Sequence, residues 1–274
     1  MTDRGERSGK VYLIGAGPGD AKLLTLKAVE ALAESDSIVY DYLVNPEVLA
    51  HAKRGVELIY AGKRAGMEST PQYEINRLLI EQARAGRTVA RLKGGDPFIF
   101  GRGGEEAEAL AEAGVRWEVI PGISAGVAAA AYAGIPLTHR DYASSVAFVT
   151  GRDGLTARDG IDWKAAARAA DTLVIFMCAE TVAKIARALI ENGRRPATPI
   201  AIIRWATYPY QEVYSGTLED IAERGESDDA GRIKIKPPAI AVVGEVVSLR
   251  SRLRWFGCES QYTVGEATAS AIEG

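Results

Sequence analysis

Arg91-Leu-Lys-Gly-Gly-Asp-Pro-Phe-Ile-Phe-Gly-Arg-Gly-Gly-Glu-Glu106 is the stretch that decides the fold. Residues 88–90 before it are typical of the end of a buried strand, and Ala107, Leu110 and Ala111 after it have the spacing of a buried helix face. The stretch therefore predicts a loop that leads from a strand to a helix. Its five glycines allow positive φ and close approach of a ligand to the backbone. In open α/β sheets, ligands bind at the carboxyl ends of strands, where this loop lies.

Three charged side chains in this loop, Asp96, Arg102 and Glu105, have little reason to be there for packing. A long solvated connection is the plainer interpretation, with Asp96 capping the loop and Glu105 favouring the helix dipole. Glycine-rich loops commonly carry function, so we favour a binding loop. Arg102 and Glu105 stand three residues apart at the helix start, and we expect them to share a face.

Strand-like and helix-like segments alternate on both sides of the loop. In the first half, each expected strand is followed by a helix, and the strands are 10–15, 38–40, 56–60, 88–91 and 117–120. This alternation predicts a parallel sheet with helical crossovers. Residues 133–142 break the alternation and are interpreted as a domain junction. Beyond them, the expected strands are 145–150, 172–177, 199–203, 212–215 and 238–244, with helices near 182–189 and 218–222.

We therefore expect a chain of two α/β domains with a loose segment at each end. The expected parts are a flexible N-terminus at 1–9, an N-terminal domain at 10–135, a C-terminal domain at 136–252 and a mobile tail at 253–274.

The bulk composition argues against several classes of protein. The 274 residues are 47% hydrophobic and 25% charged, as in soluble globular proteins. A net charge of −3 argues against a general nucleic-acid binder, which carries a basic excess. Two cysteines and two histidines without ligand spacing offer no zinc cluster, so we expect no metal. Without a signal peptide or an apolar run of about 18 residues, the chain is expected to be cytoplasmic and to lack a membrane segment.

A second glycine-rich turn, Gly15-Ala-Gly-Pro-Gly-Asp20, follows the first expected strand. It invites a dinucleotide-binding interpretation, but the fingerprint requires glycine where Asp20 stands. Pro18 also removes a backbone N–H from the turn that would bind pyrophosphate. A nicotinamide or flavin site is therefore not expected, whereas close backbone approach to a neutral or cationic ligand fits this turn.

Two long motifs carry a resemblance to a known family. Val11-Tyr-Leu-Ile-Gly-Ala-Gly-Pro-Gly-Asp20 with Leu24-Thr-Leu-Lys-Ala28 resembles the opening of the tetrapyrrole methylases, and residues 91–106 resemble their second signature. Within that family, shorter stretches resemble the uroporphyrinogen-III C-methyltransferases, namely Tyr40-Asp41, Gly62-Lys-Arg-Ala65, Pro71-Gln72, Pro121-Gly-Ile-Ser-Ala125 and Gly134-Ile-Pro-Leu-Thr-His-Arg-Asp-Tyr142. The resemblance runs from residue 10 to residue 250 and is looser in the second half.

The resemblance implies a two-domain class III methyltransferase fold, in which each domain is a sheet flanked by helices and the active site lies in the cleft between them. It implies a homodimer that uses S-adenosylmethionine, releases S-adenosylhomocysteine and needs no metal. The implied substrate is uroporphyrinogen III, methylated at C2 and C7 through precorrin-1 to precorrin-2, for sirohaem, cobalamin or haem d1.

Candidate site residues are carried over from the matching motifs. The donor would lie along Pro18, Gly94, Gly95, Asp96, Ile99, Ser124, Ala125, Met177, Ala206 and Ala241. The acidic substrate needs cations, and its candidate contacts are Lys63, Arg64, Arg102, Arg140 and, as an apolar neighbour, Met177. Arg102, Glu105 and Arg140 would orient the substrate and handle the proton lost after methylation. Asp41 is the other acid–base candidate, and without the resemblance Met177 is interpreted as filling the core.

The chain departs from the family pattern at Glu68, Cys178 and Ala206. Three alternatives stay open: a methylase that acts on a later corrinoid precursor or another substrate, a donor-binding regulatory protein without activity, and, more weakly, an oxidoreductase. The sequence leaves no room for the dehydrogenase–chelatase module that some relatives carry, so we expect the methyltransferase alone.

Overall fold

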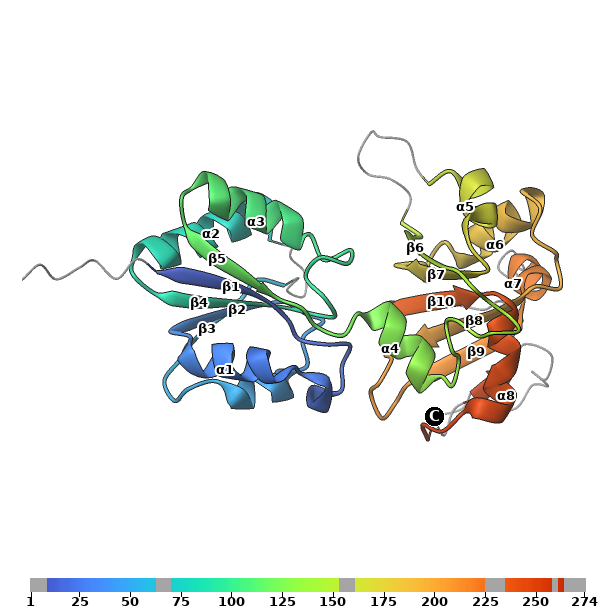
Figure 1. Ribbon diagram of the computed structural model, residues 1–274, viewed down its shortest axis with the longest axis horizontal. Coiled ribbons are helices and arrows are strands. Elements are labelled where there is room, and N and C mark those ends of the chain that lie inside the picture. Colours follow the sequence, from blue (N-terminus) through green and yellow to red (C-terminus); the bar gives the residue numbers. More distant parts are fainter. Residues whose placement is uncertain (1–8, 63–69, 153–160, 225–234, 258–260, 264–274) are drawn as a thin grey trace, which may run out of the picture. The chain divides into compact units, whose positions relative to one another are not determined.

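A computed structural model of the chain describes residues 9–62, 70–152, 161–224, 235–257 and 261–263 (Figure 1). The chain divides into two compact units, residues 1–125 and 126–274. Each unit is an α/β layer structure around its own sheet, and each is described separately below.

The first unit is built on five parallel strands. These are β1 (Lys10–Gly15), β2 (Ser37–Tyr40), β3 (Glu57–Tyr60), β4 (Thr88–Lys93) and β5 (Arg116–Ile120). Their order is β3-β2-β4-β1-β5, and every neighbouring pair is parallel. The parallel sheet expected from the sequence is confirmed. All five carboxyl ends therefore meet at one edge, which we call the carboxyl edge.

Helices cover both faces of this sheet (Figure 1). On one face, α1 (Leu26–Glu34) and the 3₁₀ helix η2 (Pro46–His51) pack against the side chains of Ile14 and Leu92. On the other face, α2 (Gln72–Arg84) and α3 (Gly103–Glu112) pack against Leu13 and Val89. A short 3₁₀ helix, η1 (Ala21–Leu23), precedes α1. Burial on both faces explains why β1 and β2 are apolar on both of their faces.

The second unit holds a mixed sheet of six strands. These are β6 (Val146–Thr150), β7 (Thr172–Phe176), β8 (Pro199–Arg204), β9 (Glu212–Thr217), β10 (Ala239–Val243) and β11 (Gln261–Thr263), in the order β11-β9-β8-β10-β7-β6. Strand β10 runs antiparallel to β7 and β8, and β8 runs antiparallel to β9. Only the outer pairs, β6 with β7 and β11 with β9, are parallel.

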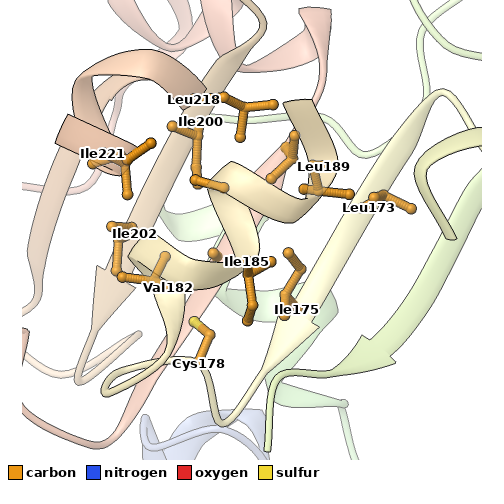
Figure 2. Close-up of a cluster of buried hydrophobic side chains, with 14 of the residues drawn as sticks. Leu173, Ile175, Cys178, Val182, Ile185, Leu189, Ile200, Ile202, Leu218 and Ile221 are labelled. Atoms are coloured by element: carbon orange, nitrogen blue, oxygen red, sulfur yellow. The ribbon is translucent and has the colours of Figure 1, made fainter. Parts of the chain in front are cut away.

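One face of the second sheet carries an apolar core. Helices α5 (Trp163–Ala169), α6 (Val182–Glu191) and α7 (Leu218–Arg224) pack there against β7, β8 and β10. Figure 2 shows α6 lying over this core, with Ile185 and Leu189 directed toward Ile175 and Leu173 of β7. On the opposite face, α4 (Ala125–Tyr132) brings Gly126 against the ring of Phe176.

Several elements differ from the expectation. Helix α5 was missed because it is short and buries only two of its alanines, Ala166 and Ala167. The segment 245–253 forms a 3₁₀ helix, η3 (Glu245–Leu249), and a last turn, α8 (Arg250–Leu253). Strand β11 lies within the tail that was expected to be mobile, and the rest of the tail beyond residue 257 lies outside the described residues.

The division at 125/126 groups α4 with the second unit. The expected domain boundary at 135/136 would keep this helix in the first, and that boundary stays a prediction. Within the ranges that the structure describes, no helix has the length and apolarity needed to cross a bilayer.

Candidate functional site

Three glycines bring the ends of β1, β4 and β5 into close backbone contact at the carboxyl edge. A Cβ atom on Gly15 would lie 2.4 Å from the nitrogen of Gly122 and 2.6 Å from the carbonyl oxygen of Gly95. A Cβ on Gly122 would lie 2.4 Å from the same oxygen, and Gly95 has φ of +70°. The first role of these glycines is therefore to let three backbone segments pack together, which builds the floor on which a ligand would lie.

The turn after β1 is hydrogen-bonded to the loop of residues 94–102 between β4 and α3, which we call the organising loop. The N–H of Gly17 donates to the carbonyl of Gly95 (3.2 Å), and the N–H of Gly95 donates to the carbonyl of Gly17 (2.6 Å). Asp20 caps η1 by accepting from the N–H of Lys22 at 2.9 Å. Because these amides bind protein groups, they are not available to a pyrophosphate, which agrees with the rejection of a dinucleotide site.

Asp96 holds the organising loop in place. Its Oδ1 accepts from the N–H of Phe98 at 2.8 Å, and its Oδ2 accepts from the N–H of Gly122 at 3.1 Å. The carboxylate thus ties the loop after β4 to the end of β5, which is the capping role. A direct role in binding the donor stays a prediction.

Ser124 stands directly before α4. Its Oγ is buried and makes no hydrogen bond within the described residues, so this hydroxyl does not cap the helix. Along the neighbouring loop, the side chains of Phe98, Ile99 and Phe100 are exposed. A buried hydroxyl without a partner, next to exposed apolar side chains, is typical of a surface that receives a ligand.

Arg102 and Glu105 form a bidentate ion pair at the start of α3. Nε and Nη2 of Arg102 donate to the two carboxylate oxygens of Glu105 at 2.8 and 2.7 Å, which confirms that the two residues share a face. The hydrogen bond raises the pKa of Arg102 and lowers the pKa of Glu105. Arg102 has φ of +59°, a conformation that is strained for a non-glycine residue. Both side chains are half exposed, so the pair is accessible from the carboxyl edge.

A buried ionic cluster lies beneath this pair, and the sequence analysis missed it. Oε1 of Glu106 accepts from Nε of Arg91 (3.0 Å), Nζ of Lys93 (2.8 Å) and Nε2 of Gln72 (3.0 Å). Glu106 is fully buried, and Arg91 and Lys93 are nearly so. Oε2 of Glu106 has no partner within the described residues. We call Arg91, Lys93 and Glu106 the buried triad.

The charges of the triad act on one another. Burial lowers the pKa of Lys93, assisted by the charge of Arg91 and opposed by Glu106. Burial alone would raise the pKa of Glu106, but the charges of Arg91 and Lys93 outweigh it and the pKa is lowered. The triad therefore holds Glu106 as a carboxylate at neutral pH.

Asp41 follows β2 and lies beside the triad. Its Oδ1 accepts from the N–H of Leu43 at 3.2 Å, and its Oδ2 lies 3.5 Å from Nη2 of Arg91. The side chain is 28% exposed. The neighbouring Leu43 packs against Gly94, where a Cβ would lie 2.8 Å from the Cβ of Leu43. Asp41 is thus partly accessible and held from two sides, a suitable arrangement for an acid–base residue.

In the second unit, non-glycine residues with positive φ lie at or next to two of the predicted donor contacts, Met177 and Ala206. Strand β7 ends at Phe176, one residue earlier than expected. Met177 follows it with φ of +54° and 45% exposure, so its interpretation as a core residue is wrong. The buried Cys178 takes that place, and burial raises the pKa of its thiol to about 12. Ala206 is flanked by Trp205 and Thr207, which also have positive φ.

The remaining candidates have diverse surroundings. Ala241 is fully buried in β10, and Arg140 is exposed in the turn between His139 and Ala143. Lys63, Arg64 and Glu68 lie outside the described residues. The first unit brings together Pro18, Asp41, Gly94, Gly95, Asp96, Ile99, Arg102, Glu105, Ser124 and Ala125 around one edge. That Arg140, Met177, Ala206 and Ala241 complete the same site stays a prediction. Among the residues that are described, no His, Cys, Asp and Glu cluster could hold a metal ion.

Comparisons with known proteins agree on one family. Residues 10–222 match the model of the tetrapyrrole (corrin/porphyrin) methylases. The siroheme synthase of Sodalis glossinidius is 50% identical over 269 residues, which cover 97% of this chain and 55% of that protein. The uroporphyrinogen-III C-methyltransferase of Bacillus subtilis is 49% identical over 251 residues, which cover 92% of this chain and 96% of that protein.

A solved structure has the same architecture. The crystal structure of uroporphyrin-III C-methyl transferase from Thermus thermophilus, complexed with S-adenyl homocysteine, is 42% identical and has a TM-score of 0.74, covering 87% of this chain and 93% of that one. The chain spans about half the length of the siroheme synthases that it matches. It spans nearly the whole length of the Bacillus protein.

Proposed function

The chain belongs to the tetrapyrrole (corrin/porphyrin) methylase family, and from that premise we propose that it is a uroporphyrinogen-III C-methyltransferase. Its two α/β units have the class III methyltransferase fold of its structural relatives. In the proposed reaction, S-adenosylmethionine methylates C2 and C7 of uroporphyrinogen III, giving precorrin-2 through precorrin-1. The near end-to-end match with the Bacillus subtilis enzyme carries this proposal.

The carboxyl edge of the first sheet fits the proposed donor. The Oγ of Ser124, which has no hydrogen-bond partner in the described part of the chain, and the exposed apolar side chains of the organising loop suit a molecule with hydroxyl groups, an adenine ring and a methyl sulfonium. When bound, S-adenosylmethionine supplies an electrophilic methyl group. The residues that would hold it are Pro18, Gly94, Gly95, Asp96, Ile99, Ser124, Ala125, Met177, Ala206 and Ala241.

The protein residues would align the reactants and exclude water, since a pyrrole carbon is electron-rich and needs no activated nucleophile side chain. A carbon–carbon bond would form between the methyl group and the ring carbon as the carbon–sulfur bond of the donor breaks, S-adenosylhomocysteine would leave, and the macrocycle would then lose one proton. Asp41 is the acid–base candidate because its carboxylate is held at one edge yet partly exposed. The ion pair of Arg102 and Glu105 would orient the substrate beside it.

The carboxylates of the substrate would be bound by arginine and lysine. Glu105 engages two of the five N–H groups of Arg102, so the same guanidinium can also bind a substrate carboxylate. Arg140 is exposed and suited to the same task. Lys63 and Arg64, which lie outside the described residues, complete the proposed set of cationic substrate contacts. The proposal includes a homodimeric cytoplasmic enzyme that supplies sirohaem, cobalamin or haem d1 synthesis.

The position of methylation tests this proposal. Purified protein is incubated anaerobically with uroporphyrinogen III and a donor carrying ¹³C in its methyl group, and the product is examined by NMR. Two new labelled methyl signals on C2 and C7 are expected. Signals at other carbons would contradict the assigned product. An unchanged substrate, while S-adenosylhomocysteine still binds in calorimetry, would contradict the assigned substrate.

A further inference from the structure

Arg91 connects two carboxylates that stand on different elements of the first unit. Its Nε donates to Glu106 at the start of α3, and its Nη2 lies 3.5 Å from Oδ2 of Asp41 after β2. Its Nη1 donates to the carbonyl of Leu92 at 3.2 Å. The arginine side chain is 3% exposed, so it reaches Asp41 from beneath the carboxyl edge.

The rest of the triad fixes this guanidinium. Glu106 is fully buried and accepts from Arg91, Lys93 and Gln72 through a single oxygen. Replacement of buried ionic groups by well-packed apolar side chains is often neutral or stabilising. Stability alone therefore does not explain three buried ionic side chains directly beneath the candidate site.

We propose that Arg91 is a positioning residue, which orients the carboxylate of Asp41 toward the tetrapyrrole while Glu106 and Lys93 hold its guanidinium in place. This inference rests on the proposed function, because it assigns Arg91 an action through Asp41. The N–H of Leu43 holds one oxygen of Asp41 and Arg91 faces the other, so the carboxylate has one orientation at the edge.

The planar fork of arginine suits this role. Nε and Nη2 lie on the same side of the guanidinium, so one side chain contacts Glu106 and Asp41 together. A lysine carries the same charge on a single nitrogen and cannot reproduce both contacts with this geometry. Arg91→Lys therefore removes the orientation of Asp41 while the buried positive charge is retained.

A double-mutant cycle distinguishes positioning from a merely structural role. Arg91→Lys is expected to lower kcat about tenfold and Asp41→Asn about a hundredfold, with little change in the Kd of S-adenosylhomocysteine. In the Asp41→Asn background, Arg91→Lys should cause less than about a twofold further loss, because its target is already gone. Equal losses in both backgrounds, or an active Arg91→Lys enzyme with unchanged kcat, would overturn the proposal.

Val89→Ala is the matched control. Val89 lies two residues earlier on the same strand and same face, is fully buried and carries no charge. It should lower the melting temperature without coupling to Asp41→Asn. If Arg91→Lys does not fold, Glu106→Asp takes its place in the cycle. This variant shortens by one methylene the side chain that anchors Arg91, and its loss of kcat is measured with and without Asp41→Asn.

A second measurement needs no substrate. Solvent exchange of the Leu43 amide, measured by NMR, reports whether Asp41 is held, because this amide donates to its Oδ1. Arg91→Lys should accelerate exchange at Leu43 and leave Lys22 unchanged, whose amide donates to Asp20 in a similar turn. Unchanged exchange at Leu43 would overturn the inference even if methylation is observed. Failure of the wild-type protein to methylate uroporphyrinogen III would instead count against the proposed function.

Discussion

The Nε atom of Arg91 lies 3.0 Å from the Oε1 atom of Glu106, and both side chains are almost completely buried. The preceding residue, Glu105, makes a bidentate ion pair with Arg102, but both of those side chains are half exposed. Two adjacent glutamates on one helix thus form ion pairs in opposite surroundings. Glu105 and Glu106 therefore allow an exposed and a buried ion pair to be compared directly in one protein.

Glu106→Ala should destabilise the fold far more than Glu105→Ala. Removal of Glu106 takes away the buried carboxylate that both Arg91 and Lys93 contact and leaves only the partly exposed Asp41 near Arg91, which costs about 3–5 kcal/mol in the free energy of unfolding. An exposed pair such as Arg102 and Glu105 contributes at most about 1 kcal/mol. Urea unfolding of both variants measures the difference. Equal losses would show that the triad is not the buried unit described above.

The stability of the protein should depend on pH through Glu106. Its pKa in the folded chain is lowered below the usual 4.5, so the unfolded state binds the proton more readily. The contribution of Glu106 is therefore fully present above pH 4.5 and is lost as pH falls through the lower folded pKa. The difference in unfolding free energy between the wild type and Glu106→Gln should shrink below pH 4.5. A difference that stays constant from pH 7 to pH 3 would contradict this assignment.

The architecture of the first unit could be predicted from the sequence because alternating strands and helices allow few topologies. The triad was missed because Arg and Lys are normally exposed. A signal for it was present. Val89, Arg91 and Lys93 alternate along one strand of a sheet that is covered on both faces, so their side chains must be buried together. A carboxylate on the following helix was then required as their partner.

The conformations of the candidate donor contacts in the second unit were harder to predict. In the sequence, Met177 is the last residue of an apolar run that predicts a strand. No glycine at this position indicates the left-handed conformation that exposes its side chain. Non-glycine residues in this conformation are maintained by the surrounding structure, so the local sequence carries no signal for them. Cys178 instead fills the core position that methionine was expected to take.

The glycines at the carboxyl edge should differ sharply in their tolerance of alanine. Gly122→Ala places a Cβ 2.4 Å from the carbonyl oxygen of Gly95, which is backbone and cannot rotate away. We expect a loss of about 1–3 kcal/mol in the free energy of unfolding. At Gly104 in α3 a Cβ meets nothing within 4 Å, so Gly104→Ala should stabilise by about 0.5–1 kcal/mol. Thermal and urea unfolding of the two variants measure whether the free energy of unfolding falls for Gly122→Ala and rises for Gly104→Ala. An unchanged free energy of unfolding for Gly122→Ala would contradict the close contact.

Substitution of Asp96 separates its two candidate roles. Asp96→Ala removes both hydrogen bonds that hold the loop, and the Kd for S-adenosylhomocysteine should rise at least about tenfold, equivalent to about 1.4 kcal/mol. Asp96→Asn keeps an acceptor for the N–H of Phe98 and should lose less. Calorimetry measures both affinities. An equal loss in the two variants, with unchanged melting temperatures, would instead indicate direct contact between the carboxylate and the donor.

The mass of the product formed from uroporphyrinogen III tests the central claim most directly. The protein is incubated anaerobically with this substrate and S-adenosylmethionine, and the tetrapyrrole is analysed by mass spectrometry. The proposed function predicts a gain of two methyl groups with formation of S-adenosylhomocysteine. No gain of methyl groups by a protein that binds S-adenosylhomocysteine would contradict it, and the substrate would then have to be sought among other tetrapyrroles.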